Sequence, residues 1–172
     1  LRKIPRRYKR FGVKSDEFRK FLKDNYPFSS VFISCTMTYW YPGVKEVIDA
    51  VKEIDKGVPV FVGGNAVKVC YEKMNETIGG DGIFLIKSQE ELEYFFNINM
   101  KGVEQEPACW EFYQNLSYGV IRLTYGCPYR CTYCSSGGNF MVINTDTAVE
   151  ELKILRKLCV TNIAFYDDAL LE

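Results

Sequence analysis

The chain has 172 residues, of which 47% are hydrophobic and 26% are charged, a composition that is ordinary for a globular protein with a packed core and argues against disorder. Lys plus Arg and Asp plus Glu both number 22, so no overall field favours nucleic acid or an anionic membrane, and we expect neither as a partner. The chain has no histidine, which excludes imidazole-activated nucleophiles and HExxH zinc sites from it.

Residues 1–26 are predicted to be a lead-in segment with one short helix. Ser15 provides a polar cap, two acidic residues follow it, and Phe18 and Leu22 lie at helical spacing. Pro27 then follows the expected end of this helix.

Residues 27–96 alternate between apolar runs of strand length and segments of helical period. The expected helices begin at Pro42, pass through Val67, and begin again at the capping box of Ser88 and Glu91. Continuously apolar strands separated by helices indicate a parallel sheet covered on both faces, so we predict a doubly wound α/β domain whose first strand is missing. The predicted strands are residues 31–35, 58–62 and 83–86.

Residues 97–117 contain Pro107 and several aromatic residues but show no sustained hydrophobic period. We interpret them as an interdomain linker that is packed against the protein and not freely flexible. Residues 118–172 then form a β-loop-α-β unit. Thr147 and Glu150 are expected to form a capping box ahead of its helix. The strands of this unit are predicted at residues 120–124 and 162–166.

The location of the protein is predicted from three features. No apolar stretch approaches the about 18 residues that span a bilayer, and the basic opening is not followed by the apolar core of a signal peptide. The seven cysteines, three of them within eight residues, fit reduced metal-binding thiols better than a secreted disulfide framework. We therefore expect a cytoplasmic protein.

Cys127, Cys131 and Cys134 directly follow the first strand of the last segment. Ligands and active sites of α/β folds lie beyond the carboxyl ends of strands. Thiolates suit iron–sulfur clusters and zinc, which usually take four protein ligands. Only three ligands are local here, which predicts an iron–sulfur cluster with one open coordination position. The alternative is a structural zinc site with Cys109 or Cys159 as the fourth ligand.

The spacing Cys127-x3-Cys131-x2-Cys134, with Tyr133 before the last cysteine, resembles the signature of the radical SAM superfamily. The resemblance implies that the three cysteines hold a 4Fe-4S cluster, that S-adenosylmethionine (SAM) chelates the fourth iron, and that Tyr133 lies next to the adenine. It also implies an electron donor such as flavodoxin or ferredoxin, reductive cleavage of SAM to a 5′-deoxyadenosyl radical, and a small-molecule or otherwise unknown substrate. The cofactors supply that chemistry, and the protein supplies geometry and excludes water.

The end of the last predicted strand extends this resemblance. Tyr166-Asp167-Asp168 stands where the radical SAM family often has Gly-Gly-Glu in contact with the SAM amino group. A carboxylate is a suitable acceptor opposite an ammonium group. Asp167 and Asp168 are both candidates for this contact.

Two strand ends in residues 27–96 resemble elements of cobalamin-binding domains. Ser34-Cys35-Thr36 corresponds to Ser-x-Leu, with Thr36 in place of leucine, and Gly63-Gly64 corresponds to Gly-Gly. The resemblance implies that a hydroxyl group binds the nucleotide tail of cobalamin and that the glycines let backbone approach it closely. The alternative is that they are the small residues found at strand ends in any doubly wound domain.

The loop that follows, residues 38–44, is unusually aromatic for a connection between a strand and a helix. It is expected either to pack against a partner barrel or to line the ligand cleft, because aromatic residues are enriched in both settings.

The whole chain thus resembles part of a radical SAM enzyme with an N-terminal cobalamin-binding-like domain. We expect a Rossmann-like sheet followed by the first βαβ unit of a truncated radical SAM (β/α) barrel. This piece is expected to be inactive alone, since the barrel needs further strands to surround SAM. Bound cobalamin would indicate a methylation or rearrangement. Two alternatives remain: a non-catalytic ligand-binding α/β module with a structural zinc site, and a purely structural interaction fragment.

Overall fold

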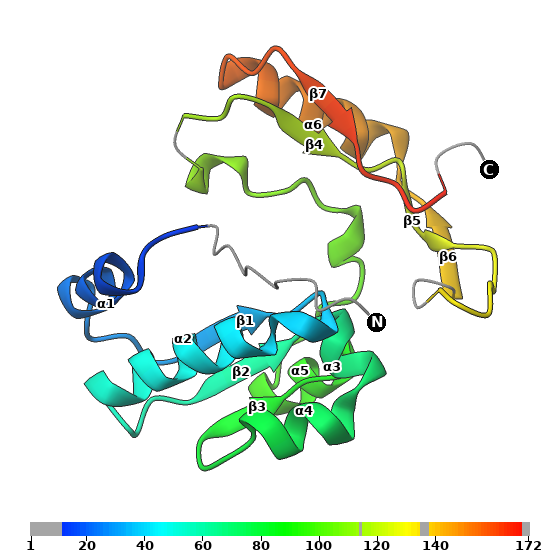
Figure 1. Ribbon diagram of the computed structural model, residues 1–172. Helices are drawn as coiled ribbons and strands as arrows, with labels where there is room; N and C mark the ends of the chain where they lie inside the picture. Colours follow the sequence, from blue (N-terminus) through cyan, green and yellow to red (C-terminus); the bar gives the residue numbers. More distant parts are fainter. Residues whose placement is uncertain (1–11, 114, 135–137, 170–172) are drawn as a thin grey trace, which may run out of the picture. The chain divides into compact units, whose positions relative to one another are not determined.

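A computed structural model describes residues 12–113, 115–134 and 138–169 of the chain. The chain divides into two compact units between Leu92 and Glu93, within the helix Gln89–Phe96 (α5). The first unit is coloured blue to green in Figure 1 and the second green to red. Within the described ranges, no helix combines the length and the apolar character that crossing a membrane requires.

The first unit contains a three-stranded parallel sheet in the order β1-β2-β3. Val31 lies opposite Val60, which in turn lies opposite Ile83. The prediction of a parallel α/β sheet is therefore confirmed. The strands are β1 (Val31–Ser34), β2 (Val60–Gly63) and β3 (Ile83–Leu85), and the helices before α5 are α1 (Ser15–Asp24), η1 (Thr38–Trp40), α2 (Tyr41–Ile54), α3 (Asn65–Val69) and α4 (Tyr71–Ile78).

The core of this unit lies on one face of the sheet. Successive side chains of a strand point to opposite faces, and Val60, Val62 and Leu85 all belong to the buried cluster. Ile48 and Val51 of α2 join the same cluster. Helices α2 and α4 contact each other as well as this cluster, so both cover the same face (Figure 1). Burying one such side chain contributes about 1.5–3 kcal/mol, which makes this face the main source of stability.

The opposite face of the sheet carries a row of three stacked phenylalanines. The ring centroids of Phe32 and Phe61 are 5.1 Å apart, as are those of Phe61 and Phe84. Phe61 on the central strand is buried, whereas Phe32 on β1 is 59% exposed. The expectation of a sheet covered on both faces is thus incompletely met in the described part of the chain, because the Phe32 side chain on this face is left largely exposed.

The helix predicted through Val67 is in fact two helices. Cys70 has φ −126° and ψ 40°, which is not helical, and it separates α3 from α4. The periodicity hides this break, because Val67 and Met74 on either side of it face the same core.

The second unit contains a βαβ unit and a hairpin. Strands β4 and β7 pair in parallel, and α6 packs against β4, whereas β5 and β6 pair antiparallel (Figure 1). The strands are β4 (Gly119–Ile121), β5 (Thr124–Cys127), β6 (Gly138–Val142) and β7 (Ile163–Phe165); the helices are η2 (Val103–Gln105), η3 (Trp110–Phe112) and α6 (Thr145–Lys157).

The core of the second unit is small. Ile121, Leu155 and Val160 are buried together, and Trp110 packs against them. Gly119 allows this packing, since a Cβ atom there would lie 2.6 Å from a methyl carbon of Leu155. The βαβ unit is therefore held by close contact between α6 and β4.

Two details of this unit differ from the prediction. The strand expected at residues 120–124 is interrupted, since β4 ends at Ile121 and β5 begins at Thr124 as one arm of an unpredicted hairpin. The expected capping box at Thr147 is wrong. Helix α6 begins earlier, where the Asn144 side chain accepts a hydrogen bond from the Asp146 backbone N–H and caps the helix.

Candidate functional site

The β5–β6 hairpin carries the three motif cysteines. Cys127 ends β5 opposite Gly138 of β6 and is half-buried. Cys131 and Cys134 lie in the exposed turn beyond it, where the Cys134 N–H donates to the Cys131 carbonyl at 3.0 Å. The Tyr133 side chain is 91% exposed. The sequence motif therefore lies on a hairpin tip that is open to solvent.

The structure does not gather these thiols into a finished metal site. All seven cysteines are free thiols. In the described ranges, no three Cys, Asp or Glu side chains come close enough together to hold a metal ion. The donor set fits an iron–sulfur cluster by chemistry, because soft, accessible thiols are what such a cluster needs.

The root of the hairpin is tied to the end of β7 by Asp167. Its Oδ1 accepts hydrogen bonds from the Leu123 N–H at 2.8 Å, the Thr124 N–H at 2.5 Å and the Thr124 hydroxyl at 2.8 Å. The guanidinium of Arg122, beside this tie, lies over the ring of Tyr166 at 4.9 Å. Asp168, the next residue, is exposed. The two acids that the sequence leaves equivalent thus have different surroundings.

Gln105 ties down the other arm of the hairpin, and sequence reasoning missed it. Its side-chain amide donates to the Val142 carbonyl at 3.3 Å, and its Oε1 accepts from the Asn144 N–H at 2.8 Å. The Thr147 hydroxyl donates to the Gln105 backbone carbonyl at 2.8 Å. Gln105 lies in an aperiodic segment, so no local signal in the sequence marks it.

In the first unit, the predicted site residues meet at the carboxyl ends of β1 and β2. Ser34 lies opposite Gly63 in the sheet register, and its side chain is exposed on the face that carries Phe32. Thr36 is also exposed. The structure therefore brings the Ser-x-Leu-like and Gly-Gly elements together at one edge, where α/β folds bind ligands.

The backbone requires glycine at only one of the two glycine positions at this edge. Gly64 has φ 98° and ψ 177°, and a Cβ atom there would lie 2.7 Å from the Cys35 carbonyl oxygen. That conformation is open almost only to glycine, so the fold itself requires Gly64. A Cβ atom on Gly63 would meet nothing closer than the Ile86 carbonyl oxygen at 3.6 Å. Nothing in the backbone therefore demands glycine at position 63.

The aromatic loop after β1 adds apolar surface to this edge. Tyr39 and Trp40 are 69% and 49% exposed. The Cys35 thiol, fully buried below the loop, donates to the Met37 carbonyl at 3.4 Å, and its burial raises the pKa of the thiol. The buried thiol anchors the loop, while the aromatic rings above it remain accessible.

Comparison with known families bears on the two interpretations of this edge. Residues 9–93 match the B12 binding domain family. The matched region contains Ser34, Thr36, Gly63 and Gly64, so the match supports the cobalamin-binding part of the resemblance. No radical SAM family matches the chain. No curated protein and no solved structure matches it significantly.

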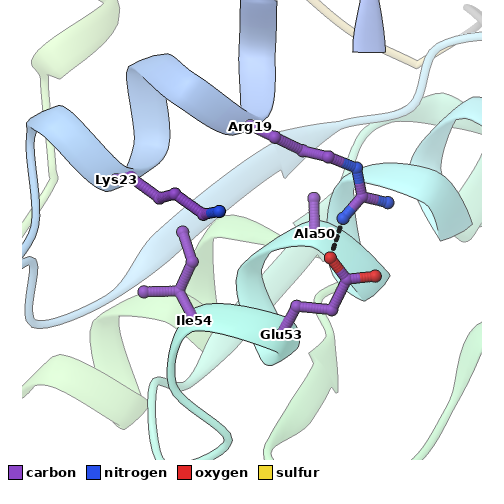
Figure 2. Close-up of a pocket in the computed structure, with 5 residues that line it drawn as sticks. All are labelled: Arg19, Lys23, Ala50, Glu53 and Ile54. Carbon is purple, nitrogen blue, oxygen red and sulfur yellow. Dashed lines mark hydrogen bonds and ion pairs between the residues drawn. The ribbon is translucent and has the colours of Figure 1, made fainter. Parts of the chain in front are cut away.

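The region that matches the B12 binding domain family also contains a pocket of about 260 Å³ between α1 and α2 (Figure 2). Arg19 on α1 forms an ion pair with Glu53 on α2 across it, and Lys23, Ala50 and Ile54 complete the lining. None of the predicted site residues lines this pocket, and its arginine is already neutralised. The strand-end edge is therefore the better candidate for ligand binding.

Proposed function

We propose that the chain is part of a cobalamin-dependent radical SAM enzyme, in which the first unit binds cobalamin and the cysteine hairpin holds a 4Fe-4S cluster that cleaves SAM. The observation that carries this proposal is the pairing of two features in one chain: a B12 binding domain match at residues 9–93, and the spacing Cys127-x3-Cys131-x2-Cys134 in the unit that follows. We further propose a cytoplasmic enzyme that is reduced by flavodoxin or ferredoxin.

For cobalamin, the support comes from the edge formed by β1 and β2. The exposed Ser34 hydroxyl is free to donate to a polar atom of the nucleotide tail, and Gly63 beside it leaves room for the tail to approach the backbone. Phe32 and Trp40 offer exposed apolar surface that would exclude water from a large planar ligand. The chain's part is thus to bind and orient the cofactor.

This part of the proposal is tested by titrating the chain with cobalamin and with cobinamide, which lacks the nucleotide tail. We expect cobinamide to bind at least about tenfold more weakly, a difference of about 1.4 kcal/mol. Gly63→Ala should weaken cobalamin binding by a similar factor without loss of stability, because its methyl group fits the fold but fills the space for the tail.

Gly80→Ala is the matched control, since a Cβ atom there would likewise meet nothing closer than 3.5 Å and the position precedes β3, at the opposite edge of the parallel sheet from the carboxyl ends of the strands. It should leave binding unchanged. Equal affinity for cobalamin and cobinamide, or no binding of either, would contradict cobalamin recognition at this edge.

For the cluster, Cys127, Cys131 and Cys134 would be the ligands, and the bound group would supply one electron to SAM. The chain's own residues would position SAM to receive that electron. The Tyr133 ring is exposed and available to stack on an adenine, and the Asp168 carboxylate is exposed and available to accept hydrogen bonds from an ammonium group.

Anaerobic reconstitution with iron and sulfide, followed by metal analysis, tests this part. About four irons with sulfide per chain are expected. Cys131→Ser should abolish iron retention, whereas Cys159→Ser, an exposed cysteine outside the motif, should not. One zinc and no iron would support a structural zinc site instead. A chain that retains neither metal nor cobalamin would support a purely structural fragment.

A further inference from the structure

The two acids of the Tyr166-Asp167-Asp168 sequence are placed for different tasks. Asp167 lies two residues beyond the end of β7, and one of its carboxylate oxygens accepts three hydrogen bonds from Leu123 and Thr124. Asp168 is exposed and has no hydrogen bond or ion pair within the part of the chain that the structure describes. The other oxygen of Asp167, Oδ2, is buried and has no hydrogen-bond partner among the described residues. Asp167 therefore points into the fold, whereas Asp168 is exposed to solvent.

The bonds to Asp167 fix the point at which the cysteine hairpin leaves the βαβ unit. Thr124 begins β5, is 7% exposed and donates two of the three bonds. Cys127 lies three residues further along the same strand. Hydrogen bonds to a carboxylate are roughly twice as strong as those between neutral groups. The direction of β5, and with it the position of Cys127, therefore depends on Asp167.

Two neighbouring contacts strengthen this hold. The Arg122 guanidinium lies over the rings of Tyr125 and Tyr166, at 5.5 Å and 4.9 Å, and thus also bridges β5 and the end of β7. Gln105 holds the β6 arm through Val142. The root of the hairpin is fastened on both arms, while Cys131 and Cys134 at its tip remain exposed.

We infer that Asp167 is a positioning residue, which orients the cysteine hairpin from the end of β7, and that Asp168 is the acid that meets the ammonium group of the ligand. This inference rests on the proposed function of the hairpin. Two adjacent carboxylates would then have separate roles. Asp167 would hold the metal-binding loop, and Asp168 would contact the cosubstrate.

The experiment compares Asp167→Ala, Asp167→Asn and Asp168→Asn in the full chain. Amide hydrogen exchange of residues 122–127, measured without metal, should be about tenfold faster in Asp167→Ala, because three bonds to the hairpin root are lost. Asp167→Asn should restore slow exchange, since its amide oxygen can accept the same bonds. Asp168→Asn, which removes the same charge one residue later, should exchange like the unmodified chain.

The electron paramagnetic resonance spectrum of the reduced, reconstituted protein supplies a readout that loosened packing alone would not change in this pattern. On addition of SAM, the spectrum should shift in the unmodified chain and in Asp167→Asn, and the shift should be lost in Asp168→Asn. The inference is overturned if Asp167→Ala leaves hydrogen exchange unchanged, or if Asp167→Asn loses the response to SAM while Asp168→Asn keeps it. Failure of the unmodified chain to retain iron would instead refute the proposed function, and hydrogen exchange would still test the positioning role.

Discussion

The two units of the chain are stabilised in different ways. Among the described residues of the first unit, fourteen form one buried cluster, and the central strand β2 contributes Val60 and Val62 with no exposed surface. The buried cluster of the second unit has three described residues, and every residue of β7 is exposed, including Phe165 at 53%. Apolar burial therefore contributes much more to the stability of the first unit than to that of the second.

Polar ties partly replace apolar packing in the second unit. The Trp110 indole N–H donates to the Glu151 carboxylate at 2.8 Å, and Gln105 and Asp167 fasten the two arms of the hairpin. A two-stranded sheet is marginal by itself, and the apolar side chains of β7 are exposed within the described residues. The comparison suggests that the second unit is the less stable of the two.

The largest expected effect comes from the small core of the second unit. Leu155 is fully buried, and Leu155→Ala should destabilise this unit by about 2–5 kcal/mol, the usual cost of such a cavity. Hydrogen exchange should accelerate throughout residues 119–165 and remain unchanged in residues 44–85. Leu152→Ala is the control, since Leu152 lies on the same helix but is 40% exposed. Equal acceleration in both units would show that they unfold together.

The next effect concerns the backbone of the first unit. Gly64→Ala would force a side chain into a conformation reserved for glycine and against the Cys35 carbonyl, and should cost about 1–3 kcal/mol in urea unfolding. Gly43→Ala lies in a helix with open space and should be neutral or gain up to about 1 kcal/mol. An unchanged urea midpoint for Gly64→Ala would mean that a side chain at position 64 is tolerated beside the Cys35 carbonyl.

The first unit could be predicted well because local sequence patterns indicate most of its helices and strands. The apolar runs at residues 31–35, 58–62 and 83–86 became β1, β2 and β3, and the periodicity from Pro42 became α2. Each pattern reports burial against the same core, so local and tertiary preferences agree. The break at Cys70 was missed because both helices that flank it keep their apolar side chains toward that core.

The second unit was harder to predict because its fixed points are contacts between distant residues. Asp167 meets Leu123 across 44 positions, and Gln105 meets Val142 across 37, and neither pairing leaves a periodic signal. The sequence could therefore identify the three cysteines but not the hairpin that carries them. It could also place an acid at the end of β7, but not distinguish Asp167 from Asp168.

The reactivity of cysteine thiols should differ between the two units, and measuring it requires no change to the sequence. Cys35 in the first unit is fully buried, and burial raises the pKa of its thiol, so little reactive thiolate is present near neutral pH. Cys131 and Cys134 in the second unit are exposed. Mass spectrometry of the metal-free chain after brief alkylation should find both hairpin cysteines modified and Cys35 unmodified. Early modification of Cys35 would contradict the compact packing of the first unit.

The smallest expected effect is a pH dependence at the edge of the first unit. Asp55 accepts hydrogen bonds from the Gly57 N–H at 2.7 Å and the Tyr26 hydroxyl at 2.9 Å, which hold the pKa of its carboxyl below the ordinary value of 3.8. A carboxyl with a lower pKa in the folded state stabilises the fold above that ordinary value, and this stabilisation is lost as the pH falls through the folded pKa. Near neutral pH, Asp55→Asn should therefore melt slightly below the unmodified chain, by a small amount because the group is exposed. The gap should close on acidification, and Tyr26→Phe, which keeps the Gly57 bond, should show part of it. A gap that widened as the pH fell would mean that these bonds do not favour the charged carboxylate.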